Sequence, residues 1–488
     1  MYKTVIFDLD GLLIDSEKIS YQLYQDLLSL YGHTFLLDNY VQNYSGKTAI
    51  GNMESLIREF SLQISLEEGL AFIQQHETSY IKQGVPLKKG ACELLEYLKM
   101  NNYQIVLATS SIKERAMTIL KQNHIDHYFD EMVFGSEVSR GKPYPDIFLK
   151  ACEKTHTSSK EALVLEDSEA GIRAAHLGHI SVVCIPDMKQ PGAVFKQMTE
   201  TILPCLNDVI HYLKLHHHYQ MIALDMDGTL LNSDKKISQK SQEVIKKAIE
   251  KGKIVVFNTG RCPAELFEYF DQLDEIRYLN CISGALVYDR KTKNTIDCQT
   301  LDTNTVKTLF EISSLENTMI QLLTEESHVQ ENQINKMADY GMGVYIPMYQ
   351  RVTKKAIDLK KEFFQQPFPV EKMNIYHTCR EDREKTRQRI KEKNLLIEMA
   401  DAELTSIEIS PLNIHKGKGL TVLCQYLNIP LCDVIVVGDG DNDREALKIA
   451  GLAVVMDNAK ESVKQLADVI VSDNDHDGCV EAIERYLL

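Results

Sequence analysis

The chain has 488 residues, of which 44% are hydrophobic and 25% charged, as is ordinary for a globular protein with a large core. Its formal net charge of −16 disfavours nucleic acid or an anionic membrane as a partner. No apolar run approaches the roughly 20 residues of a membrane span, and the cysteines are scattered singly. We therefore expect a cytoplasmic protein without a disulfide framework or a zinc site.

The first predicted strand, residues 4–7, is short and apolar and is followed directly by Asp8 and then by Asp10. In an open α/β sheet, ligands bind at the carboxyl ends of the strands. From about residue 16 to residue 82, apolar residues recur at helical spacing. This pattern predicts a helical insertion that lies over the edge of the sheet as a lid.

Three further strands are predicted at the spacing of alternating strands and helices, and each leads to polar residues suited to binding phosphate or metal. They are Thr109 and Ser110 after residues 104–108, Lys142 beyond residues 132–134, and Glu166 and Asp167 after residues 162–165. Strands that alternate with helices predict a doubly wound parallel sheet, in which these residues share one edge.

These residue types suit the cleavage of a phosphate ester. A carboxylate at a strand end can attack phosphorus and become an aspartyl phosphate, and a second carboxylate two residues later can move the proton. Mg²⁺ held by carboxylates, together with a lysine, would offset the repulsion between the acids and the phosphate. Hydroxyl and backbone N–H groups can hold the phosphoryl oxygens.

The first half, residues 1–215, resembles the haloacid dehalogenase superfamily, in the branch of β-phosphoglucomutase and related sugar-phosphate phosphatases. The resemblance rests on residues 7–17, 109–111, 141–146 and 166–171. It implies that Asp8 is the nucleophile and Asp10 the acid and base, and that both aspartates also belong to the metal site. It further implies phosphate contacts from Thr109, Ser110 and Lys142, and Mg²⁺ ligands from Glu166 and Asp167.

The same resemblance makes residues 16–82 a helical cap. Lys47, in the sequence Gly46-Lys47-Thr48, is a candidate for reaching the substrate from this cap. The alternative is that Lys47 is a solvated surface lysine.

Three adjacent histidines, residues 216–218, mark the junction between the halves. Adjacent positions cannot easily converge on one metal ion, and no cysteine or acidic cluster accompanies them. We interpret the segment as a polar linker and place the second domain at residues 219–488.

The second half repeats the pattern of the first. Strand 221–224 is followed by Asp225 and Asp227, and strand 253–257 by Thr259 and Gly260. An insertion at about residues 300–401 mixes helical patterns with predicted strands such as 344–346. The core is expected to resume at residues 406–409, before Lys416 and a strand that ends at Asp439.

This half resembles the Cof-type branch of the same superfamily, in which an α/β cap sits between the second and third motifs. The resemblance implies that Asp225 is the nucleophile and Asp227 the acid and base. It implies phosphate or substrate contacts from Thr259, Gly260, Lys416 and Asn442, and a metal site formed by Asp225, Asp227, Asp439 and Asp443.

Three assignments have alternatives at this stage. Lys418 competes with Lys416 as the lysine that bridges to phosphate. Arg261 has two possible partners, the substrate or a surface acid. Residues 473–478 fit a calcium-loop pattern, but the strand predicted before them favours a turn that caps the last helix.

The sequence thus predicts an α/β protein with two doubly wound parallel-sheet cores, one under a helical cap and one under an α/β cap. We expect Mg²⁺-dependent hydrolysis of small phosphorylated metabolites, with sugar phosphates foremost, at two sites. Two alternatives stay open: a sugar phosphomutase in the first half, or a non-catalytic phosphometabolite sensor in one half.

Overall fold

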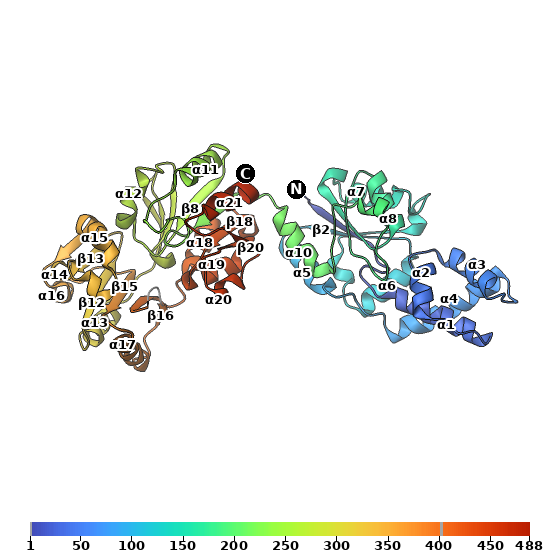
Figure 1. The fold of residues 1–488 in the computed structure, drawn as a ribbon, viewed down its shortest axis with the longest axis horizontal. Coiled ribbons are helices and arrows are strands. Elements are labelled where there is room, and N and C mark those ends of the chain that lie inside the picture. The colour runs from blue at the N-terminus through green and yellow to red at the C-terminus, as the bar shows by residue number, and fades with distance from the viewer. Residues whose placement is uncertain (1, 401–403) are drawn as a thin grey trace. The chain divides into compact units, whose positions relative to one another are not determined.

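The computed structural model describes residues 2–400 and 404–488, and it divides into two compact units that meet between His216 and His217. Figure 1 shows the first unit from blue to green and the second from green to red. Met1 and Asp401, at predicted boundaries of the first domain and of the second cap, lie outside the described residues. None of the described helices is long and apolar enough to cross a bilayer.

The core of the first unit is a six-stranded sheet with the order β3-β2-β1-β4-β5-β6, in which all neighbours run parallel. The strands are β1 (Thr4–Phe7), β2 (Gln104–Thr109), β3 (Glu131–Phe134), β4 (Ala162–Glu166), β5 (Ser181–Cys184) and β6 (Thr201–Ile202). The fully buried strand β1 lies between β2 and β4, so Asp8 emerges in the middle of the carboxyl edge.

Helices cover both faces of this sheet. Val5 and Phe7 pack into one hydrophobic cluster and Ile6 into another, as the alternation of side chains along a strand requires. The helices are α5 (Ala91–Met100), α6 (Lys113–Gln122), α7 (Asp146–Lys154), α8 (Glu169–Leu177), α9 (Ala193–Lys196) and α10 (Leu206–Leu215).

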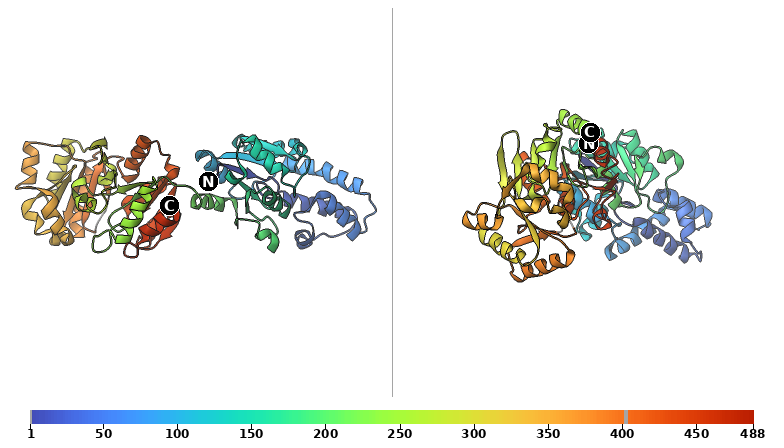
Figure 2. Two further views of the ribbon diagram at one scale, coloured as in Figure 1. Left: turned by 90° about the horizontal axis from the view of Figure 1, so that it is seen from above. Right: turned by 60° about the vertical axis from the view of Figure 1, so that its left-hand side comes forward.

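The insertion after β1 is helical. It contains α1 (Ser16–Leu30), α2 (Leu37–Asn43), α3 (Ala49–Glu59) and α4 (Leu66–Gln83). A separate cluster of buried residues, among them Tyr24, Leu28 and Tyr40, holds these helices together. Both views of Figure 2 show them, in blue, as a body beside the sheet of the first unit. We call this body the helical cap.

The core of the second unit is an eight-stranded sheet with the order β11-β10-β9-β8-β7-β18-β19-β20. Neighbours from β9 to β20 run parallel, whereas β10 and β11 form an antiparallel extension at one edge. The strands are β7 (Met221–Leu224), β8 (Ile254–Asn258), β9 (Tyr278–Cys281), β10 (Leu286–Asp289), β11 (Asn294–Cys298), β18 (Val434–Gly438), β19 (Leu452–Met456) and β20 (Val469–Val471).

Longer and shorter helices flank this core. They are α11 (Gln239–Glu250), α12 (Phe267–Phe270), α18 (Lys416–Leu427), α19 (Arg444–Ile449), α20 (Glu461–Lys464) and α21 (Gly478–Ala482), the last continuing as a π-helix over Ile483–Leu487. Leu420 and Leu423 of α18 and Ala446 of α19 pack against strand residues such as Val436.

A third sheet, with the order β14-β13-β12-β15-β17-β16, forms the α/β cap of the second unit. Its strands are β12 (Thr318–Leu323), β13 (Ser327–Gln330), β14 (Thr353–Ala356), β15 (Lys372–His377), β16 (Ile397–Ala400) and β17 (Ser406–Pro411). Residues of α13 (Thr303–Ser313), α16 (Leu359–Gln365) and α17 (Arg380–Glu392) pack on one face of this sheet.

Two predictions about the cap are wrong. Residues 406–409 do not return the chain to the core, because β17 pairs with β15 and β16 and buries Ile407 and Ile409 in the cap. Residues 344–346 are not a strand: a 3₁₀ turn, Gly343–Tyr345, leads into α15 (Ile346–Val352). There Tyr345, Met348 and Val352, three and four residues apart, pack in one local cluster, as residues on one face of a helix do.

Candidate active sites

In the first unit a buried lysine joins two acids at the carboxyl edge of the sheet. Lys142 donates from Nζ to Asp8 Oδ1 and, at 2.5 Å, to Glu166 Oε1. Burial raises the pKa of Asp8 to about 7, against the opposing charge of Lys142. Burial also disfavours the charge on Lys142, but the two acids outweigh it and raise the pKa of the lysine.

Asp167 completes this group of acids by packing against the glycine that follows Asp10. A methyl group placed on Gly11 would lie 2.2 Å from Asp167 Oδ2, so only glycine fits at this position. Its φ of +81° also favours glycine, because other residues rarely adopt that backbone conformation. Burial raises the pKa of Asp167, and the charges of Glu166 and Asp8 raise it further.

The carboxylate of Asp10 faces an arginine that the sequence did not single out. Arg115 donates from Nη2 to Asp10 Oδ1 at 2.9 Å and from Nη1 to Oδ2 at 3.1 Å, and Ser111 Oγ donates to Oδ2 at 2.7 Å. The same guanidinium donates from Nε to Glu77 of cap helix α4 at 2.9 Å. Burial would raise the pKa of Asp10, but Arg115 lowers it below the ordinary value.

The remaining predicted contacts of the first unit differ in exposure. The buried Thr109 accepts a hydrogen bond at Oγ1 from the backbone N–H of Ser111 at 3.0 Å. Ser110 is exposed, and it is its neighbour Ser111 that reaches Asp10. Lys47 is exposed in the turn between α2 and α3.

The second unit has a corresponding lysine. Lys416 is fully buried and donates from Nζ to Asp225 Oδ1 at 2.6 Å and to Asp443 Oδ1 at 2.8 Å. Lys418, the alternative, is exposed. Burial raises the pKa of Asp225 well above its ordinary value, although Lys416 lowers it.

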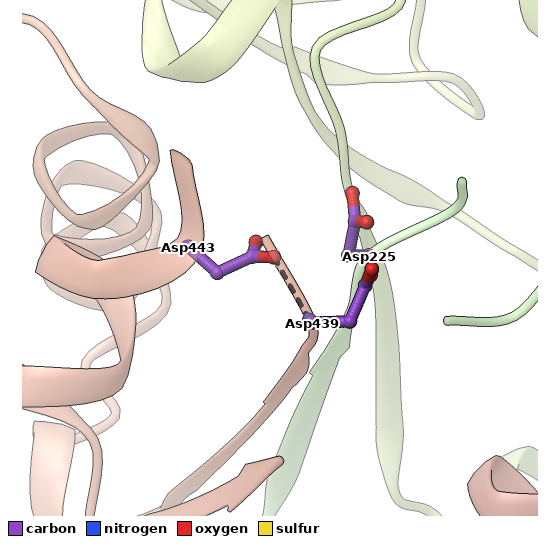
Figure 3. Close-up of side chains that lie close together, drawn as sticks. All are labelled: Asp225, Asp439 and Asp443. Atoms are coloured by element: carbon purple, nitrogen blue, oxygen red, sulfur yellow. Dashed lines mark hydrogen bonds between the residues drawn. The ribbon is translucent and has the colours of Figure 1, made fainter. Parts of the chain in front are cut away.

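Three acids of the second unit converge. One carboxylate oxygen each from Asp225, Asp439 and Asp443 lies within 4.8 Å of the others. Figure 3 shows Asp225 and Asp439 at the ends of adjacent strands, with Asp443 directed toward Asp439 from the following turn. The backbone N–H of Asp439 donates to Asp443 Oδ2 at 3.2 Å, which fixes the bend between them.

The two units reach the same arrangement with different spacing. A methyl group on Gly228 would lie 2.5 Å from Asp439 Oδ2, as one on Gly11 would meet Asp167. Asp443 accepts a hydrogen bond from the buried lysine of the second unit, as Glu166 does from the buried lysine of the first unit. In the first unit these two acids are adjacent in sequence, whereas in the second they are separated by a turn.

Asp227, like Asp10, is held by cations. Arg261 donates from Nε to Asp227 Oδ2 at 2.7 Å and from Nη2 to Oδ1 at 2.8 Å, and Lys235 donates to Oδ1 at 2.9 Å. Burial would raise the pKa of Asp227, but Arg261 foremost lowers it. Arg261 therefore pairs with an acid of the site, and Asp227 is not among the three convergent carboxylates.

A cavity of about 330 Å³ opens above these residues and is bounded by the α/β cap. Asp225, Thr259, Gly260 and Asn442 line its floor. Thr259 Oγ1 accepts a hydrogen bond from the backbone N–H of Arg261 at 3.1 Å, the same bond that Thr109 makes. The cap contributes residues that the sequence analysis did not single out: Gln321, Met342, Tyr345, Met348, Tyr349, Asn374 and Tyr376.

Two further motifs have structural partners. His217 contacts Asp433 through Nε2 at 2.6 Å, which attaches the linker to the second unit. In the calcium-like stretch, Asp475 accepts from Ser233 and Asp477 from Ser238. These acids hold the loop that follows Asp227.

Each unit thus carries, on an α/β core under a cap, a strand-end aspartate, a buried lysine and clustered acids, as a phosphoryl-transfer hydrolase requires. The family models agree: one described as haloacid dehalogenase-like hydrolase matches residues 222–483, and a second of the same description matches residues 5–185. The chain belongs to the haloacid dehalogenase-like hydrolases, with two members of the family in tandem.

Named relatives match one unit each. A phosphorylated carbohydrates phosphatase of Thermotoga maritima is 29% identical over 216 residues, which cover 43% of this chain and 100% of the relative. A 5-amino-6-(5-phospho-D-ribitylamino)uracil phosphatase of Bacillus subtilis is 27% identical, covering 55% of this chain and 96% of the relative. The chain is a phosphatase of phosphorylated compounds.

A solved structure of a haloacid dehalogenase-like hydrolase from Bacteroides thetaiotaomicron is 27% identical. The match covers 55% of this chain and 99% of that one, with a TM-score of 0.49.

Proposed function

We propose that both units hydrolyse small phosphorylated metabolites, sugar phosphates foremost, through an aspartyl-phosphate intermediate. The observation that carries the proposal is the repeated contact of a strand-end aspartate with a buried lysine, Asp8 with Lys142 and Asp225 with Lys416. A buried nucleophile beside a fixed cation suits attack on an anionic phosphate, because the cation offsets the repulsion.

In the proposed reaction a carboxylate oxygen of Asp8 or Asp225 forms a bond to phosphorus while the bond from phosphorus to the leaving oxygen breaks. Asp10 or Asp227, once its arginine is displaced, supplies the proton that the leaving oxygen takes up. The same carboxylate then accepts a proton from water, which attacks the phosphoryl aspartate and releases phosphate. The lysine stays bound to the phosphoryl group throughout.

Mg²⁺ is the proposed cofactor. The oxygen-only donor set of Asp225, Asp439 and Asp443 fits a hard divalent cation. In the first unit, Asp8 with Glu166 and Asp167 would hold it. The ion would offset the charge of the transferring phosphate. The side chains of Asp10 and Asp227 are bonded to arginines, so they are left out of the proposed set.

The two sites are proposed to differ in substrate, because a cap encloses the leaving group and the two caps have different folds. The names of the relatives suggest a substrate class for each site. A carbohydrate phosphate suits the first unit, and a phosphorylated polyol joined to a heterocycle suits the second. We further propose the cytoplasm as the compartment, since all eleven cysteines, each in the described part of the chain, are free.

The test is phosphate release from a panel of phosphorylated metabolites with Mg²⁺, using the full chain and its Asp8→Asn and Asp225→Asn variants. We expect each variant to lose at least about a hundredfold in kcat/KM on a different subset of substrates. Full activity in the double variant would contradict the proposal. Isomerised sugar phosphate in place of free phosphate would identify the first unit as a mutase.

A variant that matches the unaltered protein on every substrate would mark its unit as non-catalytic. The sensor alternative then applies to that unit.

A further inference from the structure

Strand β15 places side chains of two kinds on opposite faces of the cap sheet. Met373 and Ile375 point into the hydrophobic cluster of the cap. Lys372, Asn374 and Tyr376 alternate with them, and Asn374 and Tyr376 line the cavity above Asp225. On the neighbouring strand β12, Gln321 lies directly opposite Asn374.

These side chains form a buried network whose polarity is set at one end by a carboxylate. Gln321 donates from Nε2 to Glu265 Oε1 at 2.6 Å and to Ser327 Oγ at 2.7 Å. Burial raises the pKa of Glu265, while the charge of Arg261 and hydrogen bonds from Ser327, Cys262 and Gln321 lower it. An ionised carboxylate only accepts, so with Glu265 ionised the amide nitrogen of Gln321 faces Glu265 and its oxygen faces Asn374. We call Glu265, Gln321, Asn374 and Tyr376 the polar wall.

The orientation of Gln321 in turn fixes that of Asn374. Asn374 donates from Nδ2 to Gln321 Oε1 at 2.9 Å and to Tyr376 Oη at 3.2 Å, and Tyr376 donates its hydroxyl hydrogen to Gln321 Oε1 at 2.9 Å. Every N–H of the two amides and the hydroxyl hydrogen of Tyr376 are therefore used within the network. The polar atom of the two amides that remains without a partner is a hydrogen-bond acceptor.

That acceptor is Asn374 Oδ1, which is buried and has no hydrogen-bond partner anywhere in the described chain. Asn374 is 5% exposed as a residue and is among the residues that line the cavity. Leaving a buried polar atom unpaired costs free energy, so a group that satisfies it gains affinity. An anionic group would be repelled by this oxygen and by the carboxylate of Glu265, which also lines the cavity.

We propose that Asn374 is a specificity-determining residue of the second site and selects an uncharged leaving group that donates a hydrogen bond, an N–H or O–H, to its Oδ1. This inference rests on the proposed phosphatase activity of that site. Tyr345, Met342 and Met348 give the cavity an apolar side, so the donor belongs on a group with an apolar face as well. Heterocyclic imides and polyols meet these demands.

The test uses the full chain with Asp8→Asn, so that phosphate release reports on the second site alone. The probes are uridine 5′-phosphate, 3-methyluridine 5′-phosphate, ribitol 5-phosphate and 4-nitrophenyl phosphate. The first two differ only in the ring N–H, which a methyl group replaces. We expect kcat/KM to favour uridine 5′-phosphate over its methylated form by about tenfold or more.

Two variants of the polar wall make the prediction specific. Asn374→Leu removes the acceptor, and the ratio of the two kcat/KM values should fall toward one. Glu265→Gln keeps the volume but adds an NH₂ group at residue 265, so that the amides of Gln321 and Asn374 are no longer held in one orientation by a carboxylate. That variant should also lose the preference. Asn332→Leu, at an exposed position of α14 (Glu331–Ile334), is the matched control and should keep it.

Equal kcat/KM for the two uridine esters in the unaltered second site would assign the donor to a hydroxyl group. The inference is overturned if folded Asn374→Leu leaves kcat/KM for uridine 5′-phosphate and for ribitol 5-phosphate, each relative to 4-nitrophenyl phosphate, unchanged, because then neither an N–H nor an O–H of the leaving group depends on Asn374. It is also overturned if 4-nitrophenyl phosphate is cleaved while uridine 5′-phosphate and ribitol 5-phosphate are not. Failure to cleave any of the four esters is a different result: it contradicts the proposed function of the second site.

Discussion

At the scale of single residues, the lysine of each site is the charge on which the neighbouring acids depend. Lys416 is the cation that contacts both Asp225 and Asp443, and all three side chains are at most 7% exposed. Removing one member of a buried ion network leaves the others uncompensated, and this costs far more than losing a surface pair. The lysine is therefore structural as well as chemical.

We expect Lys416→Met to destabilise the second unit by about 3–5 kcal/mol and to abolish activity on its substrates. Urea unfolding followed by a probe in the second unit would measure the first effect. Lys418→Met is the matched control, since that lysine is exposed two residues away. Equal unfolding free energies of the two variants would show that Lys416 does not stabilise the second unit.

A second prediction at this scale concerns the glycine that follows each Asp-x-Asp pair. Gly228 and Gly252 have nearly the same φ, +82° and +81°, but only Gly228 faces a close neighbour, Asp439. Alanine costs similar backbone strain at both positions, and the clash adds about 1–3 kcal/mol at Gly228. Unfolding free energies of Gly228→Ala and Gly252→Ala should differ by that amount, and only Gly228→Ala should lose phosphatase activity on the substrates of the second unit.

At this scale the sequence predicted what lies within contiguous motifs and missed what tertiary contacts bring in. Asp8 and Lys142 stand beside recognisable neighbours in the sequence, and the structure brings them into contact. Arg115, Lys235 and Asn374 stand in ordinary helix, loop and strand patterns. Their partners come from other parts of the fold, so no spacing could have marked them.

At the scale of elements, the cap of the second unit shows how a strand can be assigned to the wrong sheet. Residues 406–409 alternate Ile407 and Ile409 with polar residues, and this pattern suits a strand in either the core or the cap. The pairing with β15 places this strand in the cap sheet, and a local sequence pattern does not reveal which strand it pairs with. Strands β1, β2, β4, β7, β8 and β18 were predictable because each is a short apolar run directly followed by candidate functional residues. Strands β6 and β19 lead to no such residues and were not predicted.

The antiparallel hairpin of β9 and β10 carries a pH-dependent contact. Asp289 on β10 accepts from Arg277 at 3.0 Å and 2.7 Å, and these bonds lower its pKa to about 2. A depressed folded-state pKa stabilises the fold above the unfolded value, near 4, and that contribution is lost as the pH falls through the folded value. The unfolding free energy of the unaltered protein should therefore approach that of Asp289→Asn between about pH 4 and pH 2.

At the scale of the whole molecule, each unit has its own sheets and its own hydrophobic clusters. An independent core is what a domain needs to fold alone. Residues 1–216 and 217–488, expressed separately, should each give a cooperative melting transition, and each should keep the substrate subset that the full-chain variants assign to it. A fragment that fails to fold would show that the unit needs the rest of the chain.

The single backbone that joins the units at His216 and His217 has a consequence for dosage. Two separate enzymes are made in amounts that vary independently, whereas the two proposed sites are synthesised once each per translated chain. The ratio of their turnover capacities is therefore fixed by the two catalytic constants and cannot be altered by expression level. Any change in that ratio between growth conditions would have to arise from ligands, modification or proteolysis.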